Sequence, residues 1–412
     1  MQILRNIKAI IRSILAWIIY GLSFLVPKDK KLWIVMGWRK NKQGELFGDN
    51  AKYFFLYASQ NLKDIKVIWL GQDNRICQRL KEHNYLAYNL NSLKGIWASM
   101  RAGYTIVDAN IRLENWQYSG GSRLVQLWHG KSLKKMGHNS PYAMGKYRKF
   151  LAPNLFRKFY LLTAASKFLG DFNVSGFRMK SEDLLVSGLP RYDILFSDIK
   201  DSDIDVDKDF EEKLKELKAK NYNKIIFYAP TFRPDGSNPL AGADLVALDK
   251  VLEQQNDYCL VSLHPKFATK DWQPDEKFHN LEFVNTGSDL YPLMKYFDLL
   301  ITDYSSLALD FLLVKVPAIL YIYDLESFKA GMGLHKEIVE ATPGPRVATF
   351  PDLLEVLKGD SYIWSSEHDK ARDLFFSYQD AHSAKRIADE LISVMDVSGQ
   401  TIAESKKFLT AK

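Results

Sequence analysis

Short apolar runs alternate with longer amphipathic stretches along most of the chain. Such runs are typical of strands that are buried on both faces of a parallel sheet. An acidic stretch over 197–209, which contains no aromatic residue, separates two groups of runs. The pattern predicts an α/β protein with two doubly wound, Rossmann-like domains in series. The first group covers 32–36, 67–70, 104–107, 124–128 and 184–186, and the second covers 225–228, 259–263, 281–284, 299–302 and 318–321.

The N-terminal segment has a different pattern, in which apolar residues recur at helical spacing and basic residues fill the intervening face. Its uncharged part, 13–26, is shorter than the roughly 20 apolar residues that a spanning helix needs. We therefore expect an amphipathic helix within residues 1–30 that lies in the membrane interface. The alternatives are a helix packed on the core and a signal peptide, although no small-residue cleavage site follows Val26. The apolar positions are Ile3, Ile7, Ile10, Ile14, Ile18, Leu22 and Leu25, and the basic ones are Arg5, Lys8 and Arg12.

The amino-acid composition indicates how large the cores can be, which redox compartment fits the chain and which charged partners are compatible with it. The chain has 412 residues, 47% of them hydrophobic, which is enough for two ordinary cores and excludes disorder as the default. Cys77 and Cys259 lie far apart and outside any ligand motif, which favours a reducing compartment over a disulfide framework or a zinc cluster. The formal net charge of +7 is compatible with nucleic acid, an anionic membrane surface or a phosphate-rich substrate.

A histidine and several lysines follow the fourth apolar run. They are His129, Gly130, Lys131, Lys134 and Lys135. An imidazole has an unperturbed pKa near 6.5, so it can take a proton from a hydroxyl at physiological pH, while lysines can contact phosphate. A capping or packing histidine is the alternative, and a lone histidine would favour it.

Polar residues also follow the first two runs of the second group. Thr231 and Arg233 come after the first of these runs, and His264 comes after the second. Ligands of doubly wound domains bind outside the carboxyl ends of the strands, so these side chains are suited to a phosphate group. An ordinary loop with a surface arginine is the alternative for each site taken alone. Their succession at neighbouring strand ends favours a phosphate site.

A third polar turn follows the run over 299–302 and leads into an apolar helix start. Ser305 and Ser306 occupy positions where helix N-caps belong. A helix N-terminus carries partial positive charge, so a diphosphate can bind there without a metal ion. Asp310, one turn later, can accept hydrogen bonds from sugar or glycerol hydroxyls. Simple helix capping accounts for the two serines equally well.

The junction between the two groups carries Gly188, Pro190, Arg191 and Asp193, a rigid turn that presents an arginine toward the expected cleft. A tight connection with Asp193 as a helix cap is the alternative. No carboxylate cluster with metal-ligand spacing, no Walker A motif and no GxGxxG motif occurs, so we expect neither a metal ion nor a cofactor. Charge neutralisation then falls to lysine, arginine, histidine and helix dipoles.

In this order the segments resemble the CDP-glycerol glycerophosphotransferase family, which contains teichoic acid primases, polymerases and related capsule enzymes. The resemblance covers the chain from about Leu32 to Phe328, and its last motif is the most specific. The matching motifs are 127–130 with Lys134, Lys135 and Gly137; Gly188, Pro190, Arg191 and Asp193; 229–231 with Arg233; 264–265; and 301–306 with Asp310.

The resemblance implies a GT-B-like pair of domains, a CDP-polyol donor such as CDP-glycerol, and displacement at the β-phosphorus with release of CMP. It implies that His129 is the general base and that His264 is a second essential histidine near the donor phosphates. The family often has Thr-Pro where Lys131 and Ser132 stand, and often Arg at Ser262, so we expect an altered donor or acceptor preference in this chain. The expected donor-binding residues are Gly130, Lys131, Arg191, Pro230, Thr231, Arg233, His264, Ser305, Ser306 and Asp310, and the expected acceptor or phosphate contacts are Lys134 and Lys135.

We accordingly expect a membrane-surface helix over 1–30, an acceptor-side domain over 31–200, a donor-binding domain over 201–385 and a helical tail over 386–412. The expected reaction moves glycerol phosphate, or a related polyol phosphate, from the CDP-activated donor to a lipid-linked acceptor of a teichoic acid or capsule-type polymer. The expected location is peripheral, on the anionic cytoplasmic face of the cell membrane. A GT-B glycosyltransferase that uses a nucleotide sugar is the first alternative. A noncatalytic polyanion-binding protein is a remote one, because the cations cluster at strand ends, and no nucleic acid is expected as a partner.

Overall fold

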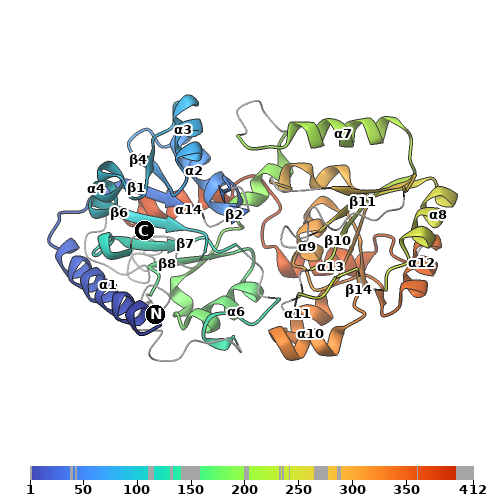
Figure 1. Ribbon diagram of the computed structural model, residues 1–412. Helices are drawn as coiled ribbons and strands as arrows, with labels where there is room; N and C mark the ends of the chain where they lie inside the picture. The colour runs from blue at the N-terminus through green and yellow to red at the C-terminus, as the bar shows by residue number, and fades with distance from the viewer. Residues whose placement is uncertain are drawn as a thin grey trace. The chain divides into compact units, whose positions relative to one another are not determined.

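Two compact units make up the chain in the computed structural model, and each is described by itself (Figure 1). Unit 1 comprises Met1–His129, Gly137–Ile204 and Asp380–Lys412, and unit 2 comprises Gly130–Met136 and Asp205–Gln379. Compared with the domains expected from the sequence, the short segment 130–136 belongs to unit 2, and the chain returns to unit 1 at 380. The structure describes residues 2–37, 40–41, 44–109, 116–129, 133–140, 158–198, 204–231, 233, 236–240, 242–263, 277–284, 289–359 and 361–395.

Unit 1 contains a parallel sheet whose described strands follow the order β5-β4-β1-β6-β7-β8-β9. The five runs expected in the first half all contain or overlap a strand. The pattern missed β5 and β8, which are only three and four residues long. The strands are β5 Ala87–Asn89, β4 Lys66–Gly71, β1 Asp29–Met36, β6 Ala102–Val107, β7 Arg123–Gln126, β8 Leu161–Ala164 and β9 Leu184–Val186, and a small separate hairpin is formed by β2 Lys40–Asn41 and β3 Gly44–Glu45.

Helices cover both faces of this sheet. One apolar core joins the sheet to α2 (Asp49–Asn61), α3 (Asn74–Glu82) and α14 (Ser383–Ser393), through residues such as Phe54, Leu80 and Ile387. A second core lies on the opposite face, where α4 (Leu93–Arg101), the 3-10 helix η2 (Trp116–Tyr118) and the inner side of α1 (Gln2–Ser23) pack. Strands buried on both faces explain the continuous apolar runs of the sequence. The remaining helices of unit 1 are α6 Lys167–Phe177 and the 3-10 helices η3 Gly137–Asn139, η5 Ser181–Asp183 and η6 Pro190–Phe196.

Unit 2 repeats the architecture with a parallel sheet of order β12-β11-β10-β13-β14-β15. Its five expected runs are all strands, so the expected α/β fold with two parallel sheets is confirmed. The strands are β12 Leu281–Val284, β11 Asp257–Ser262, β10 Lys224–Ala229, β13 Leu299–Thr302, β14 Ala318–Tyr321 and β15 Arg346–Val347. The helices are α7 Lys208–Ala219, α8 Leu245–Gln255, η7 Tyr291–Tyr296, α9 Leu307–Asp310, η8 Phe311–Val314, α10 Leu325–Met332, α11 Lys336–Ala341, α12 Phe350–Lys358 and α13 Ser366–Phe375.

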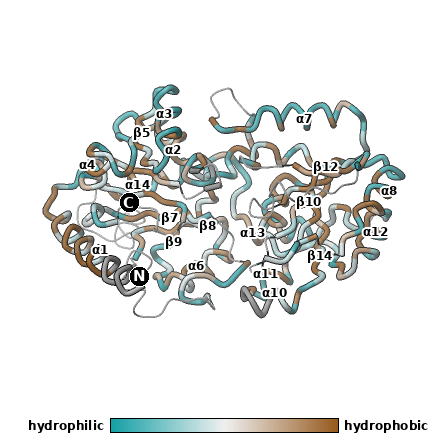
Figure 2. Tube along the Cα trace, in the orientation of Figure 1, coloured by the Kyte–Doolittle hydropathy of each residue, from teal (hydrophilic) through white to brown (hydrophobic). Residues whose placement is uncertain are grey.

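Helix α1 packs on unit 1 with one side and presents apolar residues on the other. Trp17 and Tyr20 lie with ring centroids 5.3 and 5.5 Å from that of Trp116, and the Ser23 hydroxyl accepts the Gly120 N–H at 2.8 Å. Figure 2 shows the apolar character of the helix. Within the described residues, no helix combines the length and apolarity required to span a bilayer. The exposed apolar residues of the outer side are Ile11, Ile14, Leu15, Ile18 and Leu22, and Phe24 and Leu25 just beyond the helix are exposed as well.

Asp193 links two distant parts of unit 1. Its carboxylate accepts the backbone N–H groups of Ser383 and Ala384, each at 2.9 Å. These two groups begin α14, so Asp193 supplies acceptors to N–H groups that the helix itself leaves unpaired. The carboxylate therefore fastens the C-terminal helix to the turn after β9.

Candidate active site

His129 lies just beyond β7, on a turn with an unusual backbone. The preceding Trp128 has φ of 54°, in the left-handed region that a bulky side chain rarely adopts. Its N–H donates to the side-chain oxygen of Gln126 at 2.9 Å, and its carbonyl accepts a hydrogen bond from the Asn50 amide. Such a backbone costs on the order of 1–3 kcal/mol, and it clusters at functional sites.

The imidazole of His129 has a defined orientation. Its Nδ1 lies 2.8 Å from the backbone carbonyl oxygen of Asp108, the residue after β6. A carbonyl oxygen can only accept, so Nδ1 carries the hydrogen and Nε2 of the neutral ring carries the lone pair. The side chain is half-buried. This tautomer is the one required of a proton acceptor that works through Nε2.

Arg191 lies in unit 1 with His129, at the start of η6. Its Nη1 donates to Asp49 at 2.9 Å and also to the carbonyl oxygen of His129. Both members of the ion pair are buried, with side chains 3% and 7% exposed. The guanidinium expected to contact the donor is therefore engaged by a carboxylate and by the turn that carries the imidazole.

Arg233 lies at the centre of a charged network in unit 2. Its Nη1 donates to Asp303 at 2.8 Å, while Nε and Nη2 form a fork on Asp324 at 2.6 and 3.0 Å. Asp303 also accepts the backbone N–H groups of Thr231 and Tyr304, at 2.9 and 2.6 Å. The network thus joins the turn after β10 to the turn after β13.

Lys134 and Lys135 belong to unit 2, although they follow His129 closely in the sequence. Lys134 forms an antiparallel bridge with Leu334, and its ammonium lies 5.1 Å from the ring centroid of Phe328. Burial lowers the pKa of Lys134, although the nearby carboxylate of Asp303 opposes this shift. Lys135 is exposed. Of the two lysines, only Lys134 reaches the charged network.

The serine turn after β13 begins a helix, as the sequence predicts. The Ser305 hydroxyl accepts the N–H of Leu307 at 3.3 Å. Asp310 is only 1% exposed and accepts the hydroxyl of Tyr291 at 3.0 Å. The helix α9 itself has four residues and continues as the 3-10 helix η8. Ser305 and Ser306 remain partly exposed, so their hydroxyls are within reach of a ligand.

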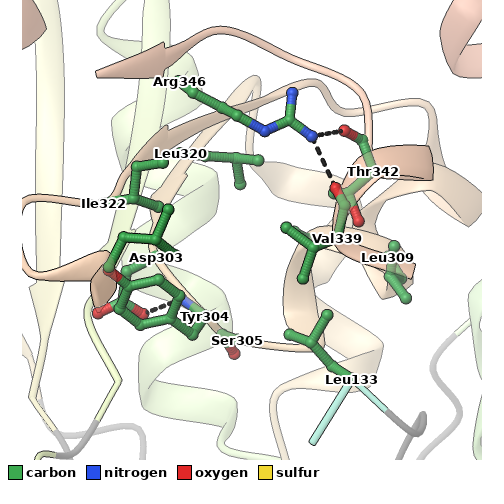
Figure 3. A pocket seen from close by; sticks show the side chains of 12 residues that line it. Leu133, Asp303, Tyr304, Ser305, Leu309, Leu320, Ile322, Val339, Thr342 and Arg346 are labelled. Atoms are coloured by element: carbon green, nitrogen blue, oxygen red, sulfur yellow. Dashed lines mark hydrogen bonds between the residues drawn. The ribbon is translucent and has the colours of Figure 1, made fainter. Parts of the chain in front are cut away.

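A cavity in unit 2 adjoins this turn (Figure 3). It contains about 410 Å³ of empty space, open solvent included. Asp303, Tyr304 and Ser305 form one side, while Arg346 reaches over it and donates to the carbonyls of Val339 and Thr342, both at 2.7 Å. Most of the wall is apolar. The other lining residues are Leu133, Ala308, Leu309, Leu320, Ile322 and Leu325.

Of the remaining expected site residues, Pro230 lies in the described part of the chain. Pro230 is buried beside Thr231 at the end of β10. His264, Gly130 and Lys131 lie outside the described residues. In the part of the chain that is described, no group of three or more histidine, cysteine, aspartate or glutamate side chains could hold a metal ion.

Sequence reasoning missed the structural role of four polar residues, two in each unit. Asp49 and Asn50 hold Arg191 and the His129 turn in unit 1, whereas Asp303 and Asp324 hold Arg233 in unit 2. Asp303 was visible only as a member of the 301–306 motif. The one available sequence signal was a carboxylate close behind an apolar run. The arginine that pairs with each carboxylate lies far away in the sequence, so no local pattern indicates the contact.

The family model described as CDP-Glycerol:Poly(glycerophosphate) glycerophosphotransferase matches residues 18–393. The chain belongs to this family. The family resemblance and the expected enzyme class are both confirmed, since the relatives of this chain are teichoic acid transferases and polymerases.

Two curated relatives show how the glycerophosphotransferase family varies. The teichoic acid poly(glycerol phosphate) polymerase of Bacillus spizizenii is 26% identical over 393 residues, which are 91% of this chain and 95% of the relative. The teichoic acid ribitol-phosphate primase of the same species is 28% identical over 278 residues, which are 66% of this chain and 69% of the relative. The relatives therefore differ both in the polyol and in the number of units added.

A solved structure has the same fold. A variant of the wall teichoic acid polymerase TagF, soaked with CDPG, matches with a TM-score of 0.70 and 20% identity, over 98% of this chain and 99% of that one. The chain thus has a GT-B-like α/β fold with two parallel sheets.

Proposed function

We propose that this chain transfers glycerol phosphate, or a related polyol phosphate, from a CDP-activated donor to a hydroxyl group of a lipid-linked acceptor, and releases CMP. The observation that carries the proposal is the hydrogen bond between Nδ1 of His129 and the Asp108 carbonyl. It leaves the lone pair of the imidazole at Nε2, on a turn whose backbone is strained. A family of glycerophosphotransferases supplies the reaction class for this base.

In this reaction Nε2 of His129 removes the proton of the acceptor hydroxyl as its oxygen attacks the β-phosphorus of the donor. A new phosphorus–oxygen bond forms, and the bond to the oxygen that bridges the two phosphates breaks. That oxygen leaves with CMP. Phosphoryl transfer asks the protein chiefly to align these groups and to stabilise charge on the equatorial oxygens, so a base and fixed cations suffice.

Unit 2 binds the donor in this proposal. Lys134 supplies a positive charge beside the serine turn, and Ser305 and Ser306 supply hydroxyl groups for the diphosphate. Thr231, Pro230, Asp310, Gly130, Lys131 and His264 complete the proposed donor set, with His264 next to the phosphates. Arg233 contributes positive potential, although its own hydrogen bonds go to Asp303 and Asp324.

Covalent connectivity supports a reaction that uses residues of both units. Leu133 lines the cavity beside Ser305, and only three residues separate it from His129. A fully extended chain covers at most about 3.6 Å per residue, so the two α-carbons are within about 14 Å of each other in any arrangement. A base so tethered can serve a phosphate bound near the serine turn.

Helix α1 brings the enzyme to its lipid-linked acceptor in this proposal. Its outer side presents apolar residues, and the basic residues at its start favour anionic lipids by about 1 kcal/mol each. We propose a peripheral location on the cytoplasmic face of the membrane. Binding in the interface requires no spanning helix.

The reaction is tested with purified full-length protein and a lipid-linked acceptor. CDP-glycerol, CDP-ribitol and UDP-N-acetylglucosamine are supplied in parallel, and the nucleotide products are separated by ion-exchange chromatography. We expect acceptor-dependent CMP from a CDP-polyol. Acceptor-dependent release of a nucleoside diphosphate would instead identify a glycosyltransferase, and the length of the product distinguishes a single addition from polymerisation.

A further inference from the structure

Two successive carbonyl groups of the His129 turn are held by buried side chains. The Asn50 amide donates to the carbonyl of Trp128, and Nη1 of Arg191 donates to the carbonyl of His129. Asn50 is fully buried, and Arg191 is only 3% exposed. These contacts hold the backbone carbonyl groups before and after the α-carbon of His129.

The two side chains are also tied to each other. The side-chain oxygen of Asn50 accepts the backbone N–H of Arg191 at 3.0 Å, and Asp49 accepts the guanidinium at 2.9 Å. Asp49 further accepts the N–H of Asn50 at 2.8 Å. Helix α2, the turn after β7 and the helix η6 therefore meet in one buried hydrogen-bonded cluster, which we call the Asp49–Asn50–Arg191 clamp.

Backbone geometry indicates that the clamp holds the turn in place. Asp49 has φ of 64° and Trp128 has φ of 54°, so a left-handed residue stands on each side of the contact. Conformations of this kind persist only where the surroundings over-determine them. Asp108 completes the arrangement, since its carboxylate accepts the N–H of Ala51 at 3.0 Å while its carbonyl accepts Nδ1 of His129.

We infer that the Asp49–Asn50–Arg191 clamp positions His129 for catalysis and that Arg191 is a positioning residue instead of a donor ligand. The inference rests on the proposed role of His129 as the base. With the clamp intact, the turn keeps Nδ1 on the Asp108 carbonyl and Nε2 toward the acceptor hydroxyl. Loss of the clamp lets the ring move while the donor site in unit 2 is unchanged.

Arg191→Lys is the main test, because lysine keeps the charge but cannot reproduce the planar fork of donors. We expect kcat to fall about 100-fold, the scale of loss from a misplacement of about 1 Å, while KM for CDP-glycerol stays within about twofold. Arg123→Lys is the matched control in the same unit, since Arg123 contacts Tyr104 and Tyr160. Its kinetics should equal those of the wild type.

A second readout does not depend on turnover. Proton–nitrogen NMR of ¹⁵N-histidine-labelled protein, assigned with a His129→Asn sample, reports which ring nitrogen of His129 carries the hydrogen. We expect Nδ1–H in the wild type and a mixture of tautomers in Arg191→Lys. If Arg191→Lys does not fold, Asn50→Ala replaces it, because it removes the contact to Trp128 without leaving a buried charge unpaired.

The outcomes separate this inference from the proposed function. A rise in KM for CDP-glycerol with unchanged kcat and unchanged His129 ring signals would make Arg191 a donor ligand and overturn the inference. If the wild type turned over no CDP-polyol, the proposed function would fail. The ring signals of His129 alone would then decide whether the clamp positions the imidazole. Unchanged signals in the folded variant would refute the clamp, and altered signals would support it.

Discussion

The guanidinium of Arg233 and the carboxylate of Asp303 lie 2.8 Å apart, and each side chain is only 3% exposed. Asp303 also holds the N–H of Thr231, so this ion pair fastens the loop after β10 to the loop after β13. Both loops stand at the carboxyl edge of the sheet, where doubly wound domains bind their ligands. The pair therefore shapes the proposed donor site even though its own hydrogen-bonding groups face each other.

Arg233→Ala should destabilise unit 2 strongly. The substitution leaves Asp303 and Asp324 without their shared cation, and breaking a buried ion pair costs about 3–5 kcal/mol. Urea unfolding followed by circular dichroism measures the loss. The control is Lys358→Ala, which removes a largely exposed pair with Glu355 and should change the free energy of unfolding by less than about 1 kcal/mol. A similarly small effect of Arg233→Ala would argue against the network.

His129→Ala should abolish most turnover and leave donor binding intact. General base catalysis contributes about 10²- to 10⁴-fold, so kcat should fall by that factor. Isothermal titration with CDP-glycerol should give an unchanged affinity. The control is His138→Ala, which removes the other imidazole of the same sequence segment. Near-normal turnover of the His129 variant would exclude its role as the base.

Lys134→Gln should weaken binding of the donor. A hydrogen bond to a charged group contributes about 1.5–3 kcal/mol, which corresponds to a loss of affinity of about 10- to 100-fold for CDP-glycerol. The neighbouring Lys135→Gln is the matched control, because Lys135 is exposed and does not reach the charged network. Titration of both variants measures the difference. Equal affinities would remove Lys134 from the donor site.

Ile14→Asp combined with Ile18→Asp should release the protein from membranes. The two residues are 47% and 54% exposed on the outer side of α1, and charges there oppose insertion into the interface. Sedimentation with anionic vesicles measures the bound fraction. Val246→Asp is the control, because Val246 on α8 is also 54% exposed but belongs to unit 2. Undiminished sedimentation of the double variant would contradict attachment through α1.

Asp193 should make stability depend on pH. Burial raises the pKa of Asp193 to about 6, against the opposing backbone hydrogen bonds from α14. Because the folded pKa is raised, the stabilisation is present in full below the unfolded pKa near 4 and is lost as pH rises through about 6. Relative to Asp193→Asn, the wild type should lose about 1 kcal/mol of unfolding free energy between pH 5 and 7.5. Denaturant titrations at both values measure this.

A control variant separates that effect from general electrostatics. Asp171 has an exposed side chain on α6 in the same unit. Asp171→Asn should therefore show a difference from the wild type that stays nearly constant between the two pH values. A constant difference for Asp193→Asn as well would show that the carboxylate does not titrate in this range.

The short-range pattern of apolar and polar residues predicted individual strands and the turns that follow them. Strand β13 and its serine turn were found because a continuous apolar run followed by N-cap residues is typical of a buried strand that leads into a helix. Strand β8 was missed although it has four residues, the same number as β13. Asp193 was placed in a turn, but its helix begins 190 residues later. No pattern in a single sequence connects positions so far apart.

In the candidate site too, local pattern indicated where residues lie but not which residues they contact. The positions of Arg191 and Arg233 behind apolar runs predicted that both lie at carboxyl edges of sheets, and they do. Their actual partners, Asp49 for the first and Asp324 for the second, come from other elements. An arginine that binds a phosphate and one that pairs with a carboxylate have the same sequence signal. Only the three-dimensional contacts distinguish them.

Unit 1 is assembled from chain segments that leave the ribosome at very different times. Ala384, Ile387 and Leu391 of α14 are part of the same core as Trp33 and Phe54. This core stays open during synthesis until α14 emerges, after the residues of unit 2 are already complete. We therefore expect that a nascent chain stopped before 380 exposes apolar surface and attracts chaperones, and that folding of the first half is a late event in biosynthesis.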